Sequence, residues 1–258
     1  MKLRSLATSP MSNNELPQSL PLSDAERKLM DKTPDAAHEV RVQQLEQRLS
    51  QLPEYAQAEL GCNSADLERA LLCLELAGLM LDLNRKTEAY PLARHAVDIF
   101  IEHKRFEDAA LACQYVYLTD GEDALAAAGQ AAWLAVTYPI DPRLTANILT
   151  HIVDETPDDS DGGAVAAATA HYIADLRSDG ADHKELTLFT GGVLARVALR
   201  HSDVKDKTFF DLWVERLELD QPEKFLVRLR NVIDVMVQTD WWFDHEKLRN
   251  ELPDQDEN

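Results

Sequence analysis

The chain has 258 residues, of which 45% are hydrophobic, which is enough apolar material for one large helical domain or two small ones. Its 46 acidic residues outnumber its 26 basic residues and give a formal net charge of −20. A negative field of this size repels phosphate groups, so it disfavours nucleic acids and anionic membrane surfaces as partners. No stretch approaches the ~20 apolar residues that a membrane-spanning helix needs. Cys62, Cys73 and Cys113 lack paired spacing for zinc and are odd in number, as in a reducing compartment, so we expect a soluble, cytoplasmic protein.

The first quarter of the chain predicts a disordered segment followed by short capping helices. Residues 1–22 are rich in Ser, Asn, Gln and Pro and have no hydrophobic period, which is typical of disorder. Residues 23–62 are predicted to form an N-terminal helical cap, with helices over 25–31, 34–52 and 53–61. Thr33 before Pro34 supports the start of the second of these, because an N-cap residue followed by proline is typical of a helix N-terminus.

Residues 63–178 contain three successive pairs of predicted helices. The expected ranges are 64–83 with 87–103, 106–118 with 122–137, and 142–153 with 164–176, the last pair being separated by an acidic, glycine-containing linker over 157–163. Alanines recur at helical spacing within these pairs, for example Ala93, Ala96 and Ala128. Small residues let helix axes approach near the short end of the ~8–10 Å range. Stacked helical hairpins of similar length predict an all-α fold in the form of a short α-solenoid.

Several short motifs in this region are similar to those of a known repeat family. The first pair carries Ala77-Gly78 and Ala93, the second begins with Phe106-Glu107-Asp108-Ala109-Ala110, and Tyr138-Pro139 follows its second helix. In these features residues 64–178 resemble tetratricopeptide repeats, which are helical hairpins with small residues at the crossings and a proline after the second helix. The resemblance is partial, because the signature Trp and Tyr positions of the first repeat helix are not filled.

The resemblance implies a protein that binds other proteins or peptides. Tetratricopeptide domains that hold a C-terminal peptide clamp its carboxylate with Lys, Arg and Asn side chains on their concave face. By this resemblance Asn84, Arg85 and Arg94 are candidate partner-binding residues. Ordinary helix-surface charge is the alternative interpretation of the same three residues.

The last third of the chain, residues 184–252, predicts helices that do not repeat, followed by an acidic tail over 253–258. Helices are expected over 184–200, 207–219 and 222–237, and Gly191-Gly192 is expected to weaken or kink the first of them. Asp240 is predicted to cap a last helix that begins at Trp241-Trp242-Phe243. Because aromatic clusters can be binding hot spots, we predict Trp242 as a contact for a partner and Trp241 as an anchor of this helix to the core.

Half of the excess negative charge lies between residues 113 and 183, where twelve Asp and Glu residues accompany only Arg143 and Arg177. The candidate partner-binding residues in this stretch are Asp154, Glu155, Asp158, Asp159 and Asp161. A field of this sign attracts basic surfaces, so the stretch predicts steering toward a positively charged protein. The alternative is a solvated face that keeps the protein soluble.

The histidines near this stretch are compatible with a second function class. Metal-ligating side chains at helical spacing are His151, Asp154, Glu155, His171, Asp175 and His183. They would suit a helical-bundle metalloenzyme or a ligand sensor, although the Glu-x-x-His order of di-iron bundles and the HExxH motif are absent. The favoured hypothesis is a non-enzymatic adaptor, assembly factor or regulator without a cofactor, which binds a protein or peptide. The sequence leaves its oligomeric state open.

Overall fold

The computed structural model describes residues 34–52 and 64–252, which form eleven helices and no strand. The helices are α2 (Pro34–Gln51), α3 (Ser64–Asp82), α4 (Lys86–Glu102), α5 (Phe106–Leu118), α6 (Ala124–Thr137), α7 (Pro142–Glu155), α8 (Asp161–Arg177), α9 (Gly180–Ser202), α10 (Lys207–Arg216), α11 (Pro222–Val237) and α12 (His245–Asn250). The predicted all-α class is confirmed for this part of the chain. The disordered segment, the helices over 25–31 and 53–61, and the acidic tail lie outside the described residues.

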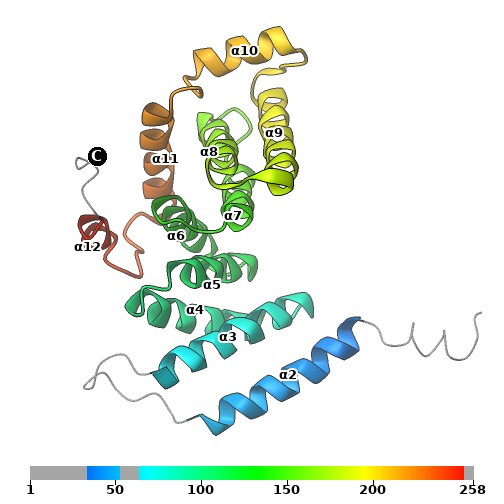
Figure 1. The fold of residues 1–258 in the computed structure, drawn as a ribbon, viewed down its shortest axis with the longest axis vertical. Coiled ribbons are helices and arrows are strands. Elements are labelled where there is room, and N and C mark those ends of the chain that lie inside the picture. Colours follow the sequence, from blue (N-terminus) through cyan, green and yellow to red (C-terminus); the bar gives the residue numbers. More distant parts are fainter. Residues whose placement is uncertain (1–33, 53–63, 253–258) are drawn as a thin grey trace, which may run out of the picture.

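Successive helices pack against one another from α2 to α9, which produces the predicted solenoid-like stack (Figure 1). The alanines expected at the seams are buried, including Ala93, Ala96 and Ala128. At Gly78 a Cβ would lie only 3.0 Å from the Tyr115 hydroxyl oxygen, so α3 and α5 also approach closely. None of the helices in the described ranges combines the length and the apolar character needed to cross a membrane.

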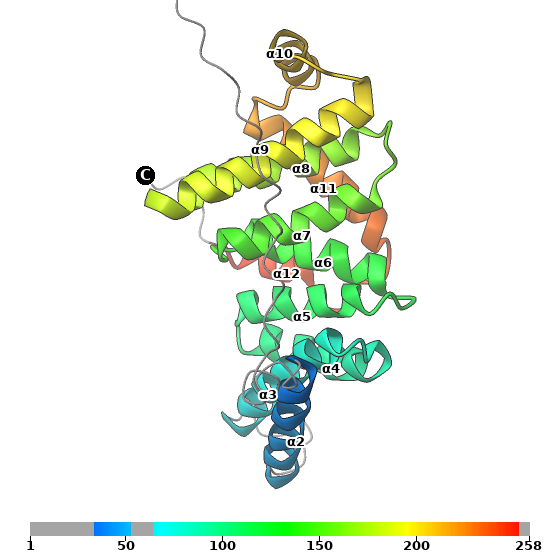
Figure 2. The ribbon, with the colours of Figure 1, turned by 90° about the vertical axis from the view of Figure 1, so that its right-hand side faces the viewer.

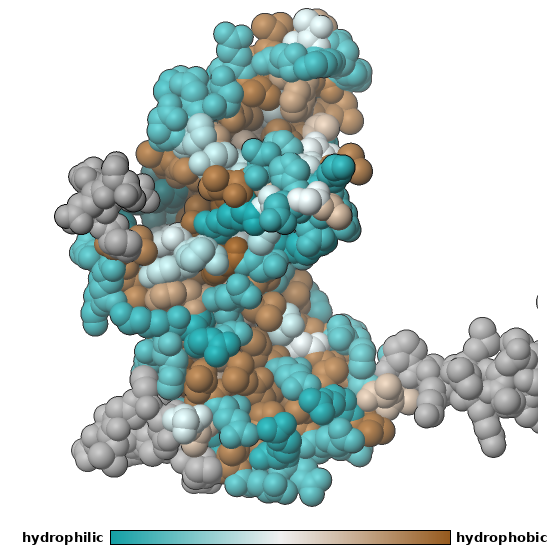
Figure 3. All heavy atoms as spheres, viewed as in Figure 1, coloured by the Kyte–Doolittle hydropathy of each residue, from teal (hydrophilic) through white to brown (hydrophobic). Residues whose placement is uncertain are grey.

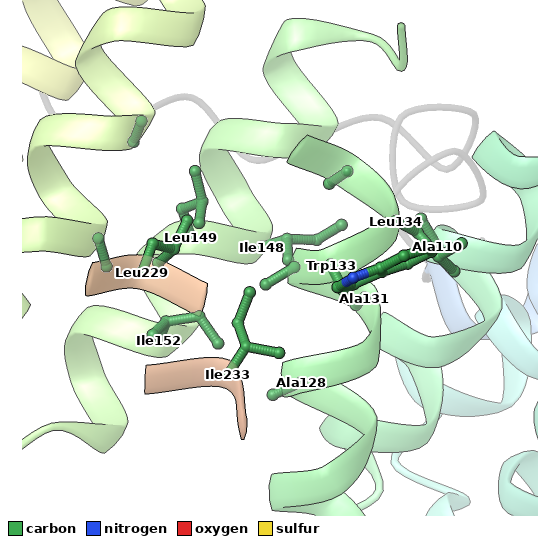
Figure 4. Packing of buried hydrophobic residues seen from close by; sticks show 14 of the residues in the cluster. Ala110, Ala128, Ala131, Trp133, Leu134, Ile148, Leu149, Ile152, Leu229 and Ile233 are labelled. Atoms are coloured by element: carbon green, nitrogen blue, oxygen red, sulfur yellow. The ribbon is translucent and has the colours of Figure 1, made fainter. Parts of the chain in front are cut away.

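Helix α11 interrupts this simple succession by turning back onto α6 and α8 (Figure 1). Figure 4 shows Leu229 and Ile233 of α11 beside Ile152 of α7 and Ala128 of α6, where they complete the core. At Gly129 of α6 a Cβ would lie 2.5 Å from a methyl group of Val237. A glycine at this position therefore lets the end of α11 contact the backbone of α6.

Two helices begin three to four residues earlier in the structure than predicted. Helix α8 begins at Asp161, inside the predicted linker over 157–163. The Ser160 side chain caps this helix, because its hydroxyl accepts a hydrogen bond from the Gly162 N–H at 3.2 Å. Gly163 is thus a packing residue, since a Cβ there would lie 2.6 Å from the Arg200 guanidinium of α9. Helix α9 begins at residue 180, four residues earlier than expected, and continues through Gly191-Gly192.

The prediction for the last helix is wrong. Asp240 is not its cap, because α12 begins at His245 and the Asp244 side chain accepts the capping hydrogen bond from the Lys247 N–H at 2.9 Å. Residues 241–243 precede the helix in an irregular conformation. The segment is not helical because the Gln130 side chain of α6 forms hydrogen bonds with its backbone, at the Asp240 carbonyl and the Trp242 N–H.

Candidate functional site

The three clamp candidates, two in the turn between α3 and α4 and one on α4, do not converge on one site. Asn84 forms the left-handed turn between these helices, with φ of 56°. The Arg85 guanidinium donates two hydrogen bonds to Glu88, at 2.7 and 2.5 Å. Arg94 donates to Asp98 at 2.8 Å. Asn84 therefore has a backbone role, and both arginines are engaged with carboxylates, since Arg85 also pairs with Glu39 of α2 at 3.4 Å.

The structure does bring two of the predicted partner-binding residues together, Arg94 of α4 and Trp242 before α12. The Arg94 guanidinium lies 4.3 Å from the ring centroid of Trp242, a cation–π contact that fixes a partly buried indole. Trp241 stacks on His245 at 3.8 Å and meets Trp133 of α6 edge-on. Both tryptophans thus attach the segment before α12 to α4 and α6.

Gln130 is the residue that sequence reasoning missed in this region. It is completely buried, its Oε1 accepts the Trp242 N–H at 2.8 Å, and its Nε2 donates to the Asp240 carbonyl at 3.3 Å. The available signal was its position, because Gln130 is the one amide side chain in the alanine-rich helix α6. A buried amide in such a helix has to find partners from elsewhere in the chain.

The acidic candidates of the middle region lie around the turn between α7 and α8, where several contact cations from distant helices. The ion pairs are Asp154 with Arg196 at 3.4 Å, Asp158 with Arg200 at 3.4 Å, and Asp161 with Arg228 at 2.8 Å; His201 Nε2 also lies 3.2 Å from the Asp161 carboxylate. Glu155 accepts a hydrogen bond from the Tyr117 hydroxyl at 2.9 Å, and Asp159 is exposed. The cations belong to α9 and α11, so these acids also connect the C-terminal helices to the stack. Steering of a basic partner by the remaining charge stays a prediction.

The histidines of the alternative hypothesis occupy three separate places. His151 Nε2 lies 3.0 Å from the Gln114 amide nitrogen, His171 lies 3.0 Å from the Thr190 hydroxyl, and His183 lies 3.6 Å from Asp175. Within residues 34–52 and 64–252, no three His, Cys, Asp or Glu side chains are grouped so that they could hold a metal ion. The described geometry therefore offers no convergent donor set for the metalloenzyme hypothesis.

His151 predicts a pH dependence of stability. Burial lowers its pKa, while Asp154 and Glu155 oppose this effect. The unfolded chain then binds more protons than the native protein below the ordinary pKa of about 6.5, so stability is lost as the pH falls from that value toward the lowered pKa. We expect the free energy of unfolding, measured by urea titration between pH 7 and 5, to fall more steeply for the wild type than for His151→Gln. Equal slopes for the two proteins would contradict this assignment.

An open, mainly apolar groove of about 680 Å³ lies between α8, α9 and α10. Its lining includes His171, Leu194, Val204, Phe210, Val214 and Leu219. In the space-filling view, apolar surface gathers beneath the region that Figure 1 labels α10 (Figure 3). Helix α10 packs only lightly on α9, which leaves this side of the stack incompletely covered.

Two lysines stand at the rim of the groove. Lys205 donates to Asp203 at 2.8 Å and Lys207 donates to Asp211 at 2.8 Å, so the rim is nearly neutral. Sequence reasoning missed the groove because its walls come from four separate segments whose apolar residues have the spacing of ordinary core positions.

No family model, curated protein or solved structure matches this chain.

Proposed function

We propose that the protein is a non-enzymatic protein–protein interaction module, acting as an adaptor, assembly factor or regulator. The observation that carries this proposal is the apolar groove between α8, α9 and α10. Open grooves between helices take up the apolar face of a partner helix or peptide, whose side chains fill the space between the helices. The partner therefore presents an apolar segment.

The charge of the molecule adds a second property of the partner. The groove rim is nearly neutral, whereas the chain as a whole carries −20. A partner whose surface around the apolar segment is basic gains from long-range attraction during encounter, and its association slows as salt rises. The tetratricopeptide-like resemblance of residues 64–178 supports the same function class.

A reducing compartment such as the cytoplasm completes the proposal. Cys73 and Cys113 are buried free thiols. Burial raises the pKa of both, which keeps them in the unreactive thiol form. Neither cysteine is needed as a covalent link in the described fold.

The test is to fill the groove without disturbing the fold. At Gly191 a Cβ would find only His171 nearby, at 3.8 Å, so Gly191→Leu projects a side chain into the groove from a helix that gains about 1 kcal/mol in intrinsic propensity. Val235→Glu, at a position that is 71% exposed on α11, is the matched control. We expect affinity capture from native lysate to recover a protein with the wild type and with Val235→Glu that is lost with Gly191→Leu.

Direct contact is checked with a photoreactive residue in place of Lys205 at the rim. The captured protein should crosslink from this position and not from Arg230 on α11, which does not line the groove. A partner that binds Gly191→Leu as tightly as the wild type, measured by calorimetry with both proteins purified, would show that the groove is not its site.

A further inference from the structure

Helix α9 presents an apolar stripe to solvent on the side opposite the core. Leu188 is 79% exposed and Leu199 is 48% exposed, and Gly192 and Ala195 lie between them on the same face, Ala195 also being a wall residue of the groove. A Cβ at Gly192 would meet no atom within 4 Å. Figure 2 shows α9 crossing in front of α8 with no described helix over it. Spacings of four, three and four residues place the four positions on one line along the helix.

We infer that this stripe is a self-association surface, on which α9 of a second copy of the chain packs antiparallel. The stripe is symmetric about the midpoint between Val193 and Leu194. Reversing the helix about this point exchanges Leu188 with Leu199 and Gly192 with Ala195. A two-fold axis at the midpoint therefore sets leucine against leucine at both ends and small residues at the crossing, as an isologous interface requires.

The charges along α9 favour the antiparallel direction. Asp182 and Glu185, near its N-terminus, are 72% and 71% exposed in their side chains and outnumber the exposed Lys184 between them. Arg196, in its C-terminal half, is 57% exposed. An antiparallel copy brings the acidic half of each helix to the basic half of the other, whereas a parallel copy would bring like charges together. Asp182 and Glu185 already pair with Arg143, and Arg196 already pairs with Asp154. The charges of α9 therefore set the direction of the second copy more than its affinity.

The size of the stripe sets the strength of the dimer. A helix of 23 residues is about 35 Å long and about 10–12 Å wide, so its face offers on the order of 400 Å² per copy. Stable specific interfaces bury about 800 Å² per partner. Phe189, 45% exposed at the edge of the stripe, adds to the contact. The expected dimer is therefore weak and dependent on concentration, and it does not rely on the proposed groove function.

Sedimentation equilibrium of the full chain over a wide concentration range tests the surface. We expect a reversible dimer whose dissociation constant rises about tenfold or more in Leu188→Glu, because the dimer would bury unpaired carboxylates. Val235→Glu, with comparable exposure on α11, should leave the dimer unchanged. A monomer at every concentration, or a dimer that persists in Leu188→Glu, overturns the inference. Gly191→Leu serves to separate the two proposals, since partner capture that persists in this variant counts against the groove alone and leaves the dimer untouched.

Cysteine crosslinking tests the direction in a Cys62→Ser background. In the antiparallel dimer Leu188→Cys of one copy faces Leu199→Cys of the other, so a mixture of the two variants should form a disulfide under mild oxidation. Each variant alone should not, because identical positions are then eleven residues apart, about 16 Å along the helices and beyond the ~7 Å Cα limit of a disulfide. Efficient crosslinking of either variant alone would show a parallel pair and overturn the assigned geometry.

Discussion

Phe225→Ala is expected to lower the free energy of unfolding by about 3–5 kcal/mol, the usual cost of removing a large buried aromatic ring. Phe225 is 2% exposed and lies in the first turn of α11, edge-on to Tyr172 of α8 at 5.7 Å. The ring fills space where α11 meets the stack, so its loss leaves a cavity that the helix cannot close without leaving α6 or α8. Chemical denaturation followed by far-UV circular dichroism measures the change.

Phe209→Ala is the matched control, because Phe209 is 62% exposed on α10. We expect this change to stay within about 0.5 kcal/mol of the wild type. A comparable loss in both variants would mean that α11 contributes no more to the core than the exposed helix α10. A normal stability of Phe225→Ala would show that α11 is not docked on α6 and α8.

The sequence was sufficient to predict most helices because their signals are local. At α7, for example, Asp141 precedes Pro142, and its carboxylate accepts hydrogen bonds from the N–H groups of Arg143 and Leu144 at 2.8 and 3.0 Å. The proline and the apolar period predict this start, and the structure adds the cap. The pairing of successive helices also followed from short connections and buried alanines.

The errors arose where a distant contact decides the local conformation. The sequence predicts Gly162-Gly163 as part of a linker, but in the structure both belong to α8, because the Arg200 side chain of α9 occupies the space that a Cβ at Gly163 would need. The same limit applies to the candidate sites. The acids around the turn between α7 and α8 looked unbalanced, since Arg196 and Arg228, which pair with two of them, are 42 and 67 residues away along the chain.

The groove and the exposed stripe of α9 show a further limit of local reasoning. Leu188 and Leu199 have the apolar character of core residues, and only the packing of α9 on α8 shows that they face outward. The groove likewise depends on where α10 lies after the turn that follows α9. No sequence motif marks the groove or the stripe, because each exists only where no other described helix covers one side of α9.

Gln130→Leu is expected to cost about 1–3 kcal/mol, because the substitution keeps the bulk of the side chain but removes its donor and acceptor. The N–H of the half-buried Trp242 then loses its partner, and an unsatisfied buried group costs about 1–3 kcal/mol, whereas the carbonyl of the exposed Asp240 can turn to water. Hydrogen exchange should report the effect locally, with loss of protection at the Trp242 amide.

The comparison with Arg94→Ala separates the role of the amide from that of the ring contact. This variant removes the cation–π interaction with Trp242, which contributes about 0.5–1 kcal/mol at a partly exposed site, and the ion pair with Asp98, but it leaves the backbone hydrogen bonds of the segment in place. Its Trp242 amide should therefore keep most of its protection. If Gln130→Leu also kept that protection, the packing of Trp241 against Trp133 and His245 would be sufficient to hold the segment, and Gln130 would have only the role of filling α6.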